Sequence, residues 1–278
     1  MTYDALGAGA LDYMPCRYRG SKLLFRGPER RLDVPYVAFL GGTSTYGKFI
    51  KNPFPALVES GLGLNCVNFG IASAGVDVML HDPFLKEASR NAEATVIQII
   101  GAQNLSNRFY TVHPRRNDRF VRASPLLTAI YPEVDFAEFH FNRHMLSCLY
   151  NVSSDRFEVV RDELQTAWLA RMKLLLKKVA NKVVLVWFAD HAPTPRALDA
   201  VDPGTAPSPL FVTSEMIDDL ASHATDVVQV VATPEAIAAG TEGMVFSQME
   251  AMAAAELLGP NAHGELAKAL GPILHDLV

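Results

Sequence analysis

The sequence predicts an α/β protein, a three-layer α/β/α sandwich around a mostly parallel sheet of roughly five strands. Three observations lead to this fold class. Short apolar runs alternate with stretches of helical period between residues 35 and 278. The apolar runs are continuous, which is typical of strands that helices cover on both faces. Right-handed crossovers would also bring the ends of the first three strands to one edge of the sheet.

Length and composition restrict the class of protein further. The 278 residues can bury a sizeable core, and 49% hydrophobic with 20% charged residues indicates a globular chain. A net charge of -5 argues against a general nucleic-acid partner, and no apolar run is long enough to cross a membrane. The three cysteines are far apart, and no secretion signal is seen, so the expected location is cytoplasmic.

Residues 1–34 read as an irregular N-terminal arm. They mix aromatic residues, arginines, glycines and prolines without a helical or strand period. We expect the arm to wrap on the body or on a second subunit, which would give a homo-oligomer. A solvated arm is the favoured interpretation of its arginines.

The first half of the body reads as alternating strands and helices. The expected strands are residues 35–41, 64–69 and 94–100, and the expected helices are 53–62 and 83–91. A small, flexible segment, residues 71–75, follows the second strand.

An insertion at about residues 105–160 interrupts the single domain expected over 35–278. About 80 residues separate the third strand from the fourth, well above the usual crossover length. A polar loop at 103–108 and a basic loop at 113–122 come first. Helices are expected over 134–150 and 155–180.

The last third of the chain completes the alternation. Strands are expected at residues 182–188 and 226–231, with a proline-rich loop at 192–209 between them and a helix over 214–223. Helices over 248–257 and 262–276 end the chain.

The loops after the first three strands carry the parts of an acyl-transfer site. A hydroxyl nucleophile needs a base within hydrogen-bond distance, and its tetrahedral intermediate needs donors directed at the oxyanion. The first loop supplies the hydroxyls of Thr43 and Ser44, the second supplies the N–H of Gly70, and the third supplies the amides of Gln103 and Asn104. These residues would share one edge of the sheet.

The turn at residues 41–47 resembles that of the SGNH, or GDSL-like, hydrolase superfamily. That family has Gly-Asp-Ser-x-Thr-x-Gly after its first strand, and this chain has a turn of the same length, Gly-Gly-Thr-Ser-Thr-Tyr-Gly. Here the acidic position is Gly42 and the nucleophile position is Thr43, with Ser44 one residue later. The chain is also similar to a group of bacterial proteins that share a Gly-Gly-[Ser/Thr]-x-Thr-Tyr-Gly turn.

Two later blocks extend the resemblance. Residues 68–70 (Asn-Phe-Gly) look like the family's Asn-x-Gly after the second strand. Residues 101–104 (Gly-Ala-Gln-Asn) are similar to its Gly-x-Asn-Asp, with Gln103 at the oxyanion position. The resemblance implies an SGNH/flavodoxin-like sheet and ester hydrolysis.

The last block implies the base. Residues 256–260 (Glu-Leu-Leu-Gly-Pro) resemble the family's Asp-x-x-His-Pro, with Glu256 at the acid and Gly259 at the histidine position. His263 lies four residues on, about 6 Å along a helix. We therefore expect His263 to act as the base, with Glu256 as its acid.

Further residues are candidates for substrate binding: Asn68, Tyr46, Arg108, Arg115, Arg116 and His191. Guanidinium groups bind carboxylate, phosphate or sulfate, so an anionic substrate fits the basic segment, whereas a solvated or subunit-contact loop is the competing interpretation. His191 is also an alternative base that Asp190 could orient. No metal-ligand spacing is present beyond one i, i+4 histidine pair, and no cofactor is expected.

The leading hypothesis is an esterase or deacetylase that acts on a small acyl ester of a sugar or another polar carrier. The substituted Asp, Ser and His positions support an alternative, a non-catalytic SGNH-like module that binds an anionic carbohydrate or a protein partner. A third hypothesis is an acyl or other group transferase that uses the same pocket. The glycine patterns of P-loop and dinucleotide enzymes do not follow any predicted strand.

Overall fold

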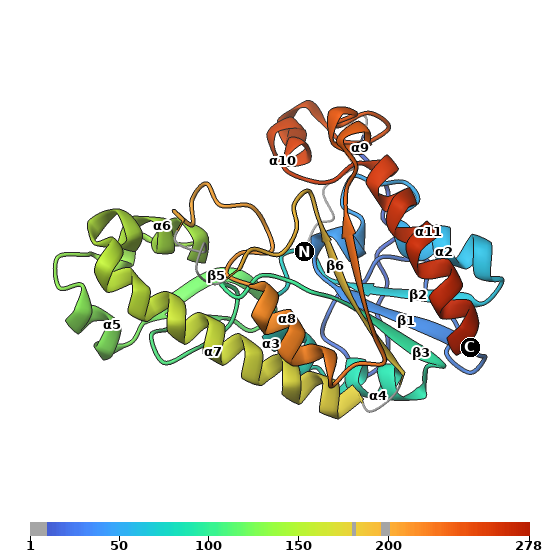
Figure 1. Cartoon of the computed structure of the whole chain (residues 1–278), viewed down its shortest axis with the longest axis horizontal. Helices are drawn as coiled ribbons and strands as arrows, with labels where there is room; N and C mark the ends of the chain where they lie inside the picture. The colour runs from blue at the N-terminus through green and yellow to red at the C-terminus, as the bar shows by residue number, and fades with distance from the viewer. Residues whose placement is uncertain (1–9, 180–181, 196–200) are drawn as a thin grey trace.

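A five-stranded parallel sheet lies at the centre of the computed structural model, which describes residues 10–179, 182–195 and 201–278 (Figure 1). The strand order is β2-β1-β3-β6-β7, and every neighbouring pair is parallel. The strands are β1 (Tyr36–Gly41), β2 (Asn65–Gly70), β3 (Ala94–Gln98), β6 (Val183–Ala189) and β7 (Asp226–Val231). The predicted parallel sheet of five strands is confirmed.

Burial explains why the central strands are mostly apolar. β1, β3 and β6 are buried at every position, because strands flank them on both sides and helices cover both faces. β7 forms one edge of the sheet, and from Val228 onward its residues alternate between buried and exposed.

Helices cover both faces, so the predicted three-layer sandwich is also confirmed. α2 (Phe54–Leu62) and α11 (Pro260–Leu277) pack against each other over one core. The opposite face carries α3 (Val76–His81), α4 (Pro83–Asn91), α7 (Ser154–Val179) and α8 (Ser214–Ala221) over a larger core (Figure 1). Alternate residues of β1 serve the two cores: Val37 and Phe39 face the first, and Ala38 and Leu40 face the second.

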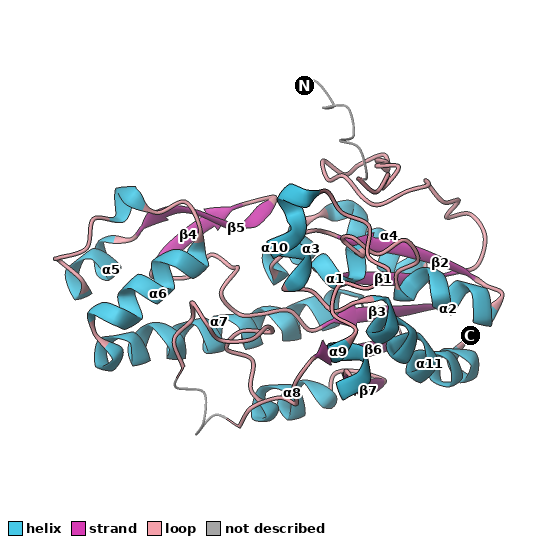
Figure 2. Cartoon of the chain, turned by 90° about the horizontal axis from the view of Figure 1, so that it is seen from above, coloured by secondary structure: helices cyan, strands magenta, loops and turns pink. Residues whose placement is uncertain are grey.

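The insertion forms an extension beside the sheet (Figure 2). It contains the hairpin of β4 (Tyr110–His113) and β5 (Arg116–Ala123), then α5 (Pro125–Ile130), a 3-10 turn η1 (Phe136–Glu138) and α6 (Asn142–Val152). The basic loop expected at 113–122 is therefore mostly strand. Its pattern was hidden because only Asn117 and Phe120 of β5 are buried, between charged residues, and the pairing with β4 is irregular.

Short helices that the sequence analysis did not identify complete the connections. They are α3 after β2 and α9 (Pro234–Ala238) after β7, each too short to show a helical period. The helix expected over 248–257 is divided into η3 (Gln248–Glu250) and α10 (Ala251–Ala255).

The described part of the N-terminal arm packs on the body. Tyr18, Leu23 and Phe25 are buried, and the Tyr18 ring stacks on Phe84 with centroids 4.9 Å apart. Phe25 meets the edge of the Phe69 ring at 5.5 Å. The described part of the arm thus wraps on the body, one of the two placements expected, because these aromatic side chains join the larger core.

Two further features concern the state of the cysteines and the character of the helices. Cys16, Cys66 and Cys148 are free thiols, and burial raises the pKa of Cys66 to about 12, as befits a core residue. Among the helices of the described segments, none combines the length and the apolar character that crossing a bilayer requires.

Candidate active site

The carboxyl end of β1 is a topological switch point. The chain passes from β1 to β2 on one side and then to β3 on the other, an arrangement that leaves a crevice for ligands. The loops after these strands meet there. The backbone N–H of Ser73 donates to Thr43 Oγ1 at 3.0 Å, and the carbonyl oxygen of Asn104 lies 1.5 Å from where a Cβ of Gly75 would stand.

The turn after β1 is a four-residue helix, α1 (Thr43–Tyr46), that two neighbouring strands hold in place. From β3, Gln98 Oε1 accepts hydrogen bonds from the N–H of Gly42 (3.1 Å) and from the N–H (3.2 Å) and hydroxyl (2.7 Å) of Thr45. From β2, Asn68 Nδ2 donates to the carbonyl oxygen of Thr45 at 2.7 Å. Thr45 is therefore clamped between the two strands that flank β1.

Two glycines make this close packing possible. A Cβ on Gly41 would lie 2.1 Å from Thr45 Oγ1 and 2.8 Å from Gln98 Oε1. A Cβ on Gly70 would lie 2.2 Å from the backbone nitrogen of Tyr46. Any larger residue at either position would push the turn away from the sheet.

The two candidate hydroxyls differ in their surroundings. Thr43 and Ser44 are both half-buried, but it is Thr43 whose oxygen accepts the Ser73 N–H. Ser73 has a left-handed backbone conformation, with φ of 58°, which turns the loop back toward α1. This hydrogen bond fixes the position of the Thr43 oxygen at the carboxyl edge of the sheet.

The expected oxyanion donor Gly70 is a correction. Its N–H donates to Asn68 Oδ1 at 2.8 Å, so it is not free to stabilise an oxyanion. Both ends of the Asn68 amide are used inside the chain, which also removes Asn68 from the substrate-binding candidates. Asparagine often bonds the backbone N–H two residues on, an alternative that the sequence pattern does not reveal.

The third loop presents two amides. Asn104 Oδ1 accepts from Asn142 Nδ2 at 3.0 Å, which leaves the Asn104 NH2 group as the end available to a ligand. Gln103 Oε1 is buried and has no hydrogen-bond partner among the residues that the structure describes. Asn104 thus remains a candidate donor to an oxyanion, whereas the unpartnered atom of Gln103 is an acceptor.

The extension supports the second and third loops through two asparagines that the sequence analysis missed. Asn117 Oδ1, from β5, accepts the N–H groups of Gly75 (3.0 Å) and Val78 (3.1 Å). Asn142 Nδ2, from α6, bridges Asn104 Oδ1 and the carbonyl oxygen of Asn117. A buried asparagine needs such partners, but nothing local in the sequence marks either residue as buried.

His263 does not have the position of a base. It is 1% exposed, its ring stacks on Phe54, and its Nδ1 accepts the Phe54 N–H at 3.1 Å. Burial, and then the positive charge of Arg26, lower the pKa of His263 to about 3. Because Nδ1 accepts a hydrogen bond, the neutral ring carries its proton on Nε2 and has no free lone pair. The assignment of His263 as base is therefore wrong.

His191 keeps the features of a base. Its Nδ1 lies 2.7 Å from Asp190 Oδ1, just after the carboxyl end of β6. With the proton on Nδ1 directed at the carboxylate, Nε2 retains a free lone pair. The carbonyl oxygen of His191 accepts from Trp187 Nε1 at 2.8 Å, which folds the loop back on its strand. β6 is two strands from β1, so His191 shares the edge with Thr43 without a hydrogen bond to it.

The remaining candidates are spread over the molecule. The Tyr46 ring lies 5.1 Å from that of Tyr13, and burial raises its pKa to about 12. Glu256 is exposed after α10. Arg108 forms an ion pair with Glu163 at 2.8 Å. Arg115 and Arg116 are exposed at the turn of the β4–β5 hairpin.

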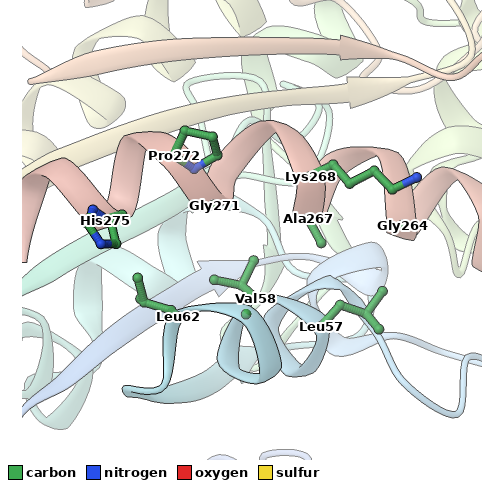
Figure 3. Close-up of a pocket in the computed structure, with 10 residues that line it drawn as sticks. Leu57, Val58, Leu62, Gly264, Ala267, Lys268, Gly271, Pro272 and His275 are labelled. Atoms are coloured by element: carbon green, nitrogen blue, oxygen red, sulfur yellow. The ribbon is translucent and has the colours of Figure 1, made fainter.

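Two hollows lie elsewhere. A groove of 530 Å³ runs between α2 and α11, with Leu57, Val58, Leu62 and Ala267 in its walls (Figure 3). A second, of 350 Å³, lies between the arm and the start of α2. Neither is lined by Thr43 or Ser44. Within the described segments, no group of three His, Cys, Asp or Glu side chains could hold a metal ion.

Comparison with known proteins places the chain in a family. No curated protein matches it. A solved structure, the lipase Lip_vut3 from goat rumen metagenome, covers 85% of this chain and 96% of its own at 12% identity, with a TM-score of 0.39, too low to support an argument. The family DUF6473, a domain of unknown function, matches residues 1–278. Since this match spans the whole sequence, the chain belongs to the DUF6473 family.

Proposed function

We propose that this protein is an SGNH-like ester hydrolase, an esterase or deacetylase that removes a small acyl group from a polar or carbohydrate carrier. The observation that carries the proposal is the 3.0 Å hydrogen bond from the Ser73 N–H to Thr43 Oγ1. It joins a hydroxyl to a fixed backbone donor at the switch point of a parallel sheet, where ligands bind.

In this proposal Thr43 Oγ1 attacks the ester carbonyl carbon, and its proton passes to Nε2 of His191. The Asn104 NH2 group stabilises the oxyanion, and the Ser73 N–H holds the attacking oxygen in place. The alcohol leaves with the proton from His191, and water then hydrolyses the acyl-threonine. Asp190, 2.7 Å from Nδ1, supports the imidazolium that forms in each step.

The proposal requires the His191 side chain, just after β6, to approach Thr43 when the ester binds. Catalytic hydrogen bonds often form only in the complex with substrate. Contacts already connect the residues after β6 with the third loop. Thr194 forms a β-bridge with Thr213, and the carbonyl oxygen of Leu210, three residues before Thr213, accepts the Ala102 N–H at 2.8 Å.

The test is hydrolysis of acetylated sugars and phenyl acetate by the wild type and four variants. Thr43→Val and His191→Gln should each reduce kcat by about 100-fold or more, since each removes a group that acts in the transition state. Thr43→Ser should retain activity, because it keeps the hydroxyl and removes the methyl group that crowds the attack. Ser44→Ala should behave as the wild type.

The double variant Thr43→Val/Ser44→Ala is the control for a contaminating esterase. Equal hydrolysis by this variant and the wild type would exclude both hydroxyls as the nucleophile. Full activity of His191→Gln would exclude the proposed base.

The enclosure of His263 favours a second candidate, a catalytically degenerate module that binds without turnover. The position of the SGNH histidine is Gly259 in this chain. The nearest histidine along the chain, His263, already accepts the Phe54 N–H at its Nδ1. Such a module would bind a carboxylate at the Asn104 amide. Calorimetric titration with acetate and glucuronate would then show binding that Asn104→Leu weakens, with no hydrolysis of the corresponding esters.

A further inference from the structure

We propose that Gln98 is a positioning residue, which holds the Thr43 hydroxyl against the Ser73 N–H by way of Thr45. The catalytic consequence rests on the proposed function, whereas the positioning rests on hydrogen bonds alone. Gln98 is the last residue of β3, a strand buried at every position, and only 6% of it is exposed. A polar side chain buried in such a strand requires a specific set of partners.

The partners of Gln98 all belong to the turn after β1. Its Oε1 accepts from the N–H of Gly42, the N–H of Thr45 and the hydroxyl of Thr45, at 3.1, 3.2 and 2.7 Å. One oxygen thus binds both ends of the segment that contains Thr43. The bonds are shielded from water, so each resists exchange with solvent more than a surface bond would.

The turn needs this support because α1 has little of its own. It is one turn long, and its N-cap, Gly42, offers no side chain to the N–H groups at the start of the helix. Gln98 supplies the missing acceptor from a rigid strand. Asn68 fixes the carbonyl oxygen of the same Thr45, so the turn is held at both its donor and its acceptor groups.

Two substitutions of Gln98 distinguish the contribution of the acceptor oxygen from that of the rest of the side chain. Gln98→Glu keeps an oxygen that can accept all three bonds and replaces only the amide NH2. Gln98→Met has similar length and no such acceptor. Gln229→Met, on the exposed part of β7, is the matched control for a loss of one glutamine.

The first readout is amide hydrogen exchange of Gly42 and Thr45, which needs no substrate. In Gln98→Met the exchange of both amides should accelerate by about tenfold or more, as expected for loss of a buried hydrogen bond, while Gln98→Glu and the control remain slow. Thr45→Val should accelerate the amide exchange of Gly42 less than Gln98→Met does, because Thr45→Val removes one donor and leaves the acceptor oxygen of Gln98.

The second readout is ester hydrolysis. Gln98→Met should lower kcat with little change in KM, because the hydroxyl is displaced while the surface that binds substrate is kept, and Gln98→Glu should restore kcat. Unchanged exchange in Gln98→Met would overturn the inference, and so would equal losses in Gln98→Glu and Gln98→Met. An inactive wild type would overturn the proposed function alone, since amide exchange would still decide whether Gln98 holds the turn.

Discussion

His263, in the first turn of α11, is buried against the start of α2, where its Nδ1 accepts the Phe54 N–H. This bond gives the histidine a structural role, since it satisfies an N–H at the start of α2, which follows a proline. The same burial that fits the ring to this role opposes its protonation. At the residue scale, a histidine near the end of the chain thus changes from a candidate base to a helix cap.

The stability of the fold should therefore depend on pH through His263. Its pKa is about 3 in the folded protein and 6.5 in the unfolded chain. As pH falls from 6.5 toward 3, only the unfolded chain binds this proton, so the free energy of unfolding decreases by about 1.4 kcal/mol per pH unit. Above pH 6.5 this contribution is fully present.

Urea unfolding between pH 4 and 7 measures this effect in wild type and His263→Asn. Asparagine retains an acceptor for the Phe54 N–H and cannot titrate, so its unfolding free energy should fall less steeply with acid. Parallel curves for the two proteins would contradict the assignment. His275→Asn, at an exposed histidine, should match the wild type.

At the scale of elements, two glycines of this chain differ in what their positions require. Gly41 ends β1 against Thr45 and Gln98, where even a methyl group collides. Gly264 lies inside α11 beside the groove in Figure 3, and a Cβ there would meet nothing within 4 Å. The first glycine is required by a close approach, whereas the second only weakens its helix.

Alanine should consequently have opposite effects at the two positions. Gly264→Ala should raise the free energy of unfolding by about 1 kcal/mol, the difference in helix propensity. Gly41→Ala should lower it by about 1–3 kcal/mol, because Thr45 and Gln98 must move. Chemical denaturation of both variants checks the signs, and stabilisation by Gly41→Ala would show that the turn is not packed as described.

At the scale of the whole molecule, the arm and the extension are both tied to the sheet. Phe25 of the arm is fully buried against Phe69, which precedes the last residue of β2. Arg26 donates to the carbonyl oxygens of Tyr46 and Gly47, at the end of the turn that carries Thr43. Segments that lie outside the sheet in sequence thus determine the shape of its carboxyl edge.

Truncation of the arm's aromatic anchor should destabilise the entire fold. Phe25→Ala should reduce the free energy of unfolding by about 3–5 kcal/mol, the usual result of emptying a buried phenylalanine site. The exposed Leu24 is its neighbour and control: Leu24→Ala should change stability by less than about 0.5 kcal/mol. Similar small effects of both would mean that the arm does not contribute to the core.

If the protein hydrolyses esters as proposed, we expect the exposed arginines at the turn of the hairpin to give it a preference for anionic esters. Asn117 fixes the start of β5 to the second loop, and Arg115, beside it, has no carboxylate partner within the described segments. Arg115→Gln/Arg116→Gln should lower kcat/KM for 4-acetoxybenzoate several-fold and leave phenyl acetate unchanged, with the difference shrinking at high salt. Arg122→Gln, exposed farther along β5, should have no such effect; equal losses on both esters would exclude charge recognition.

Most of the fold could be predicted from the sequence because strands and long helices bury regular patterns. The β-branched run of β3 and the stripe of Leu164, Trp168 and Met172 on α7 are local signals, and both residue sets are buried as expected. The hairpin was missed because β5 buries only Asn117 and Phe120, three positions apart, among charged residues. Short helices such as α3 show too few residues for a period to appear.

The sequence by itself determined which loops meet, because strand order and crossover handedness place the ends of the first three strands together. Only the tertiary structure decided which groups in those loops are already engaged: the Gly70 N–H by Asn68, and His263 by Phe54. The physical reason is that hydrogen-bond partners and burial depend on contacts between residues distant in sequence, as with the 209 positions between Phe54 and His263. A motif specifies the chemistry that is present, and packing selects the atoms that remain free to perform it.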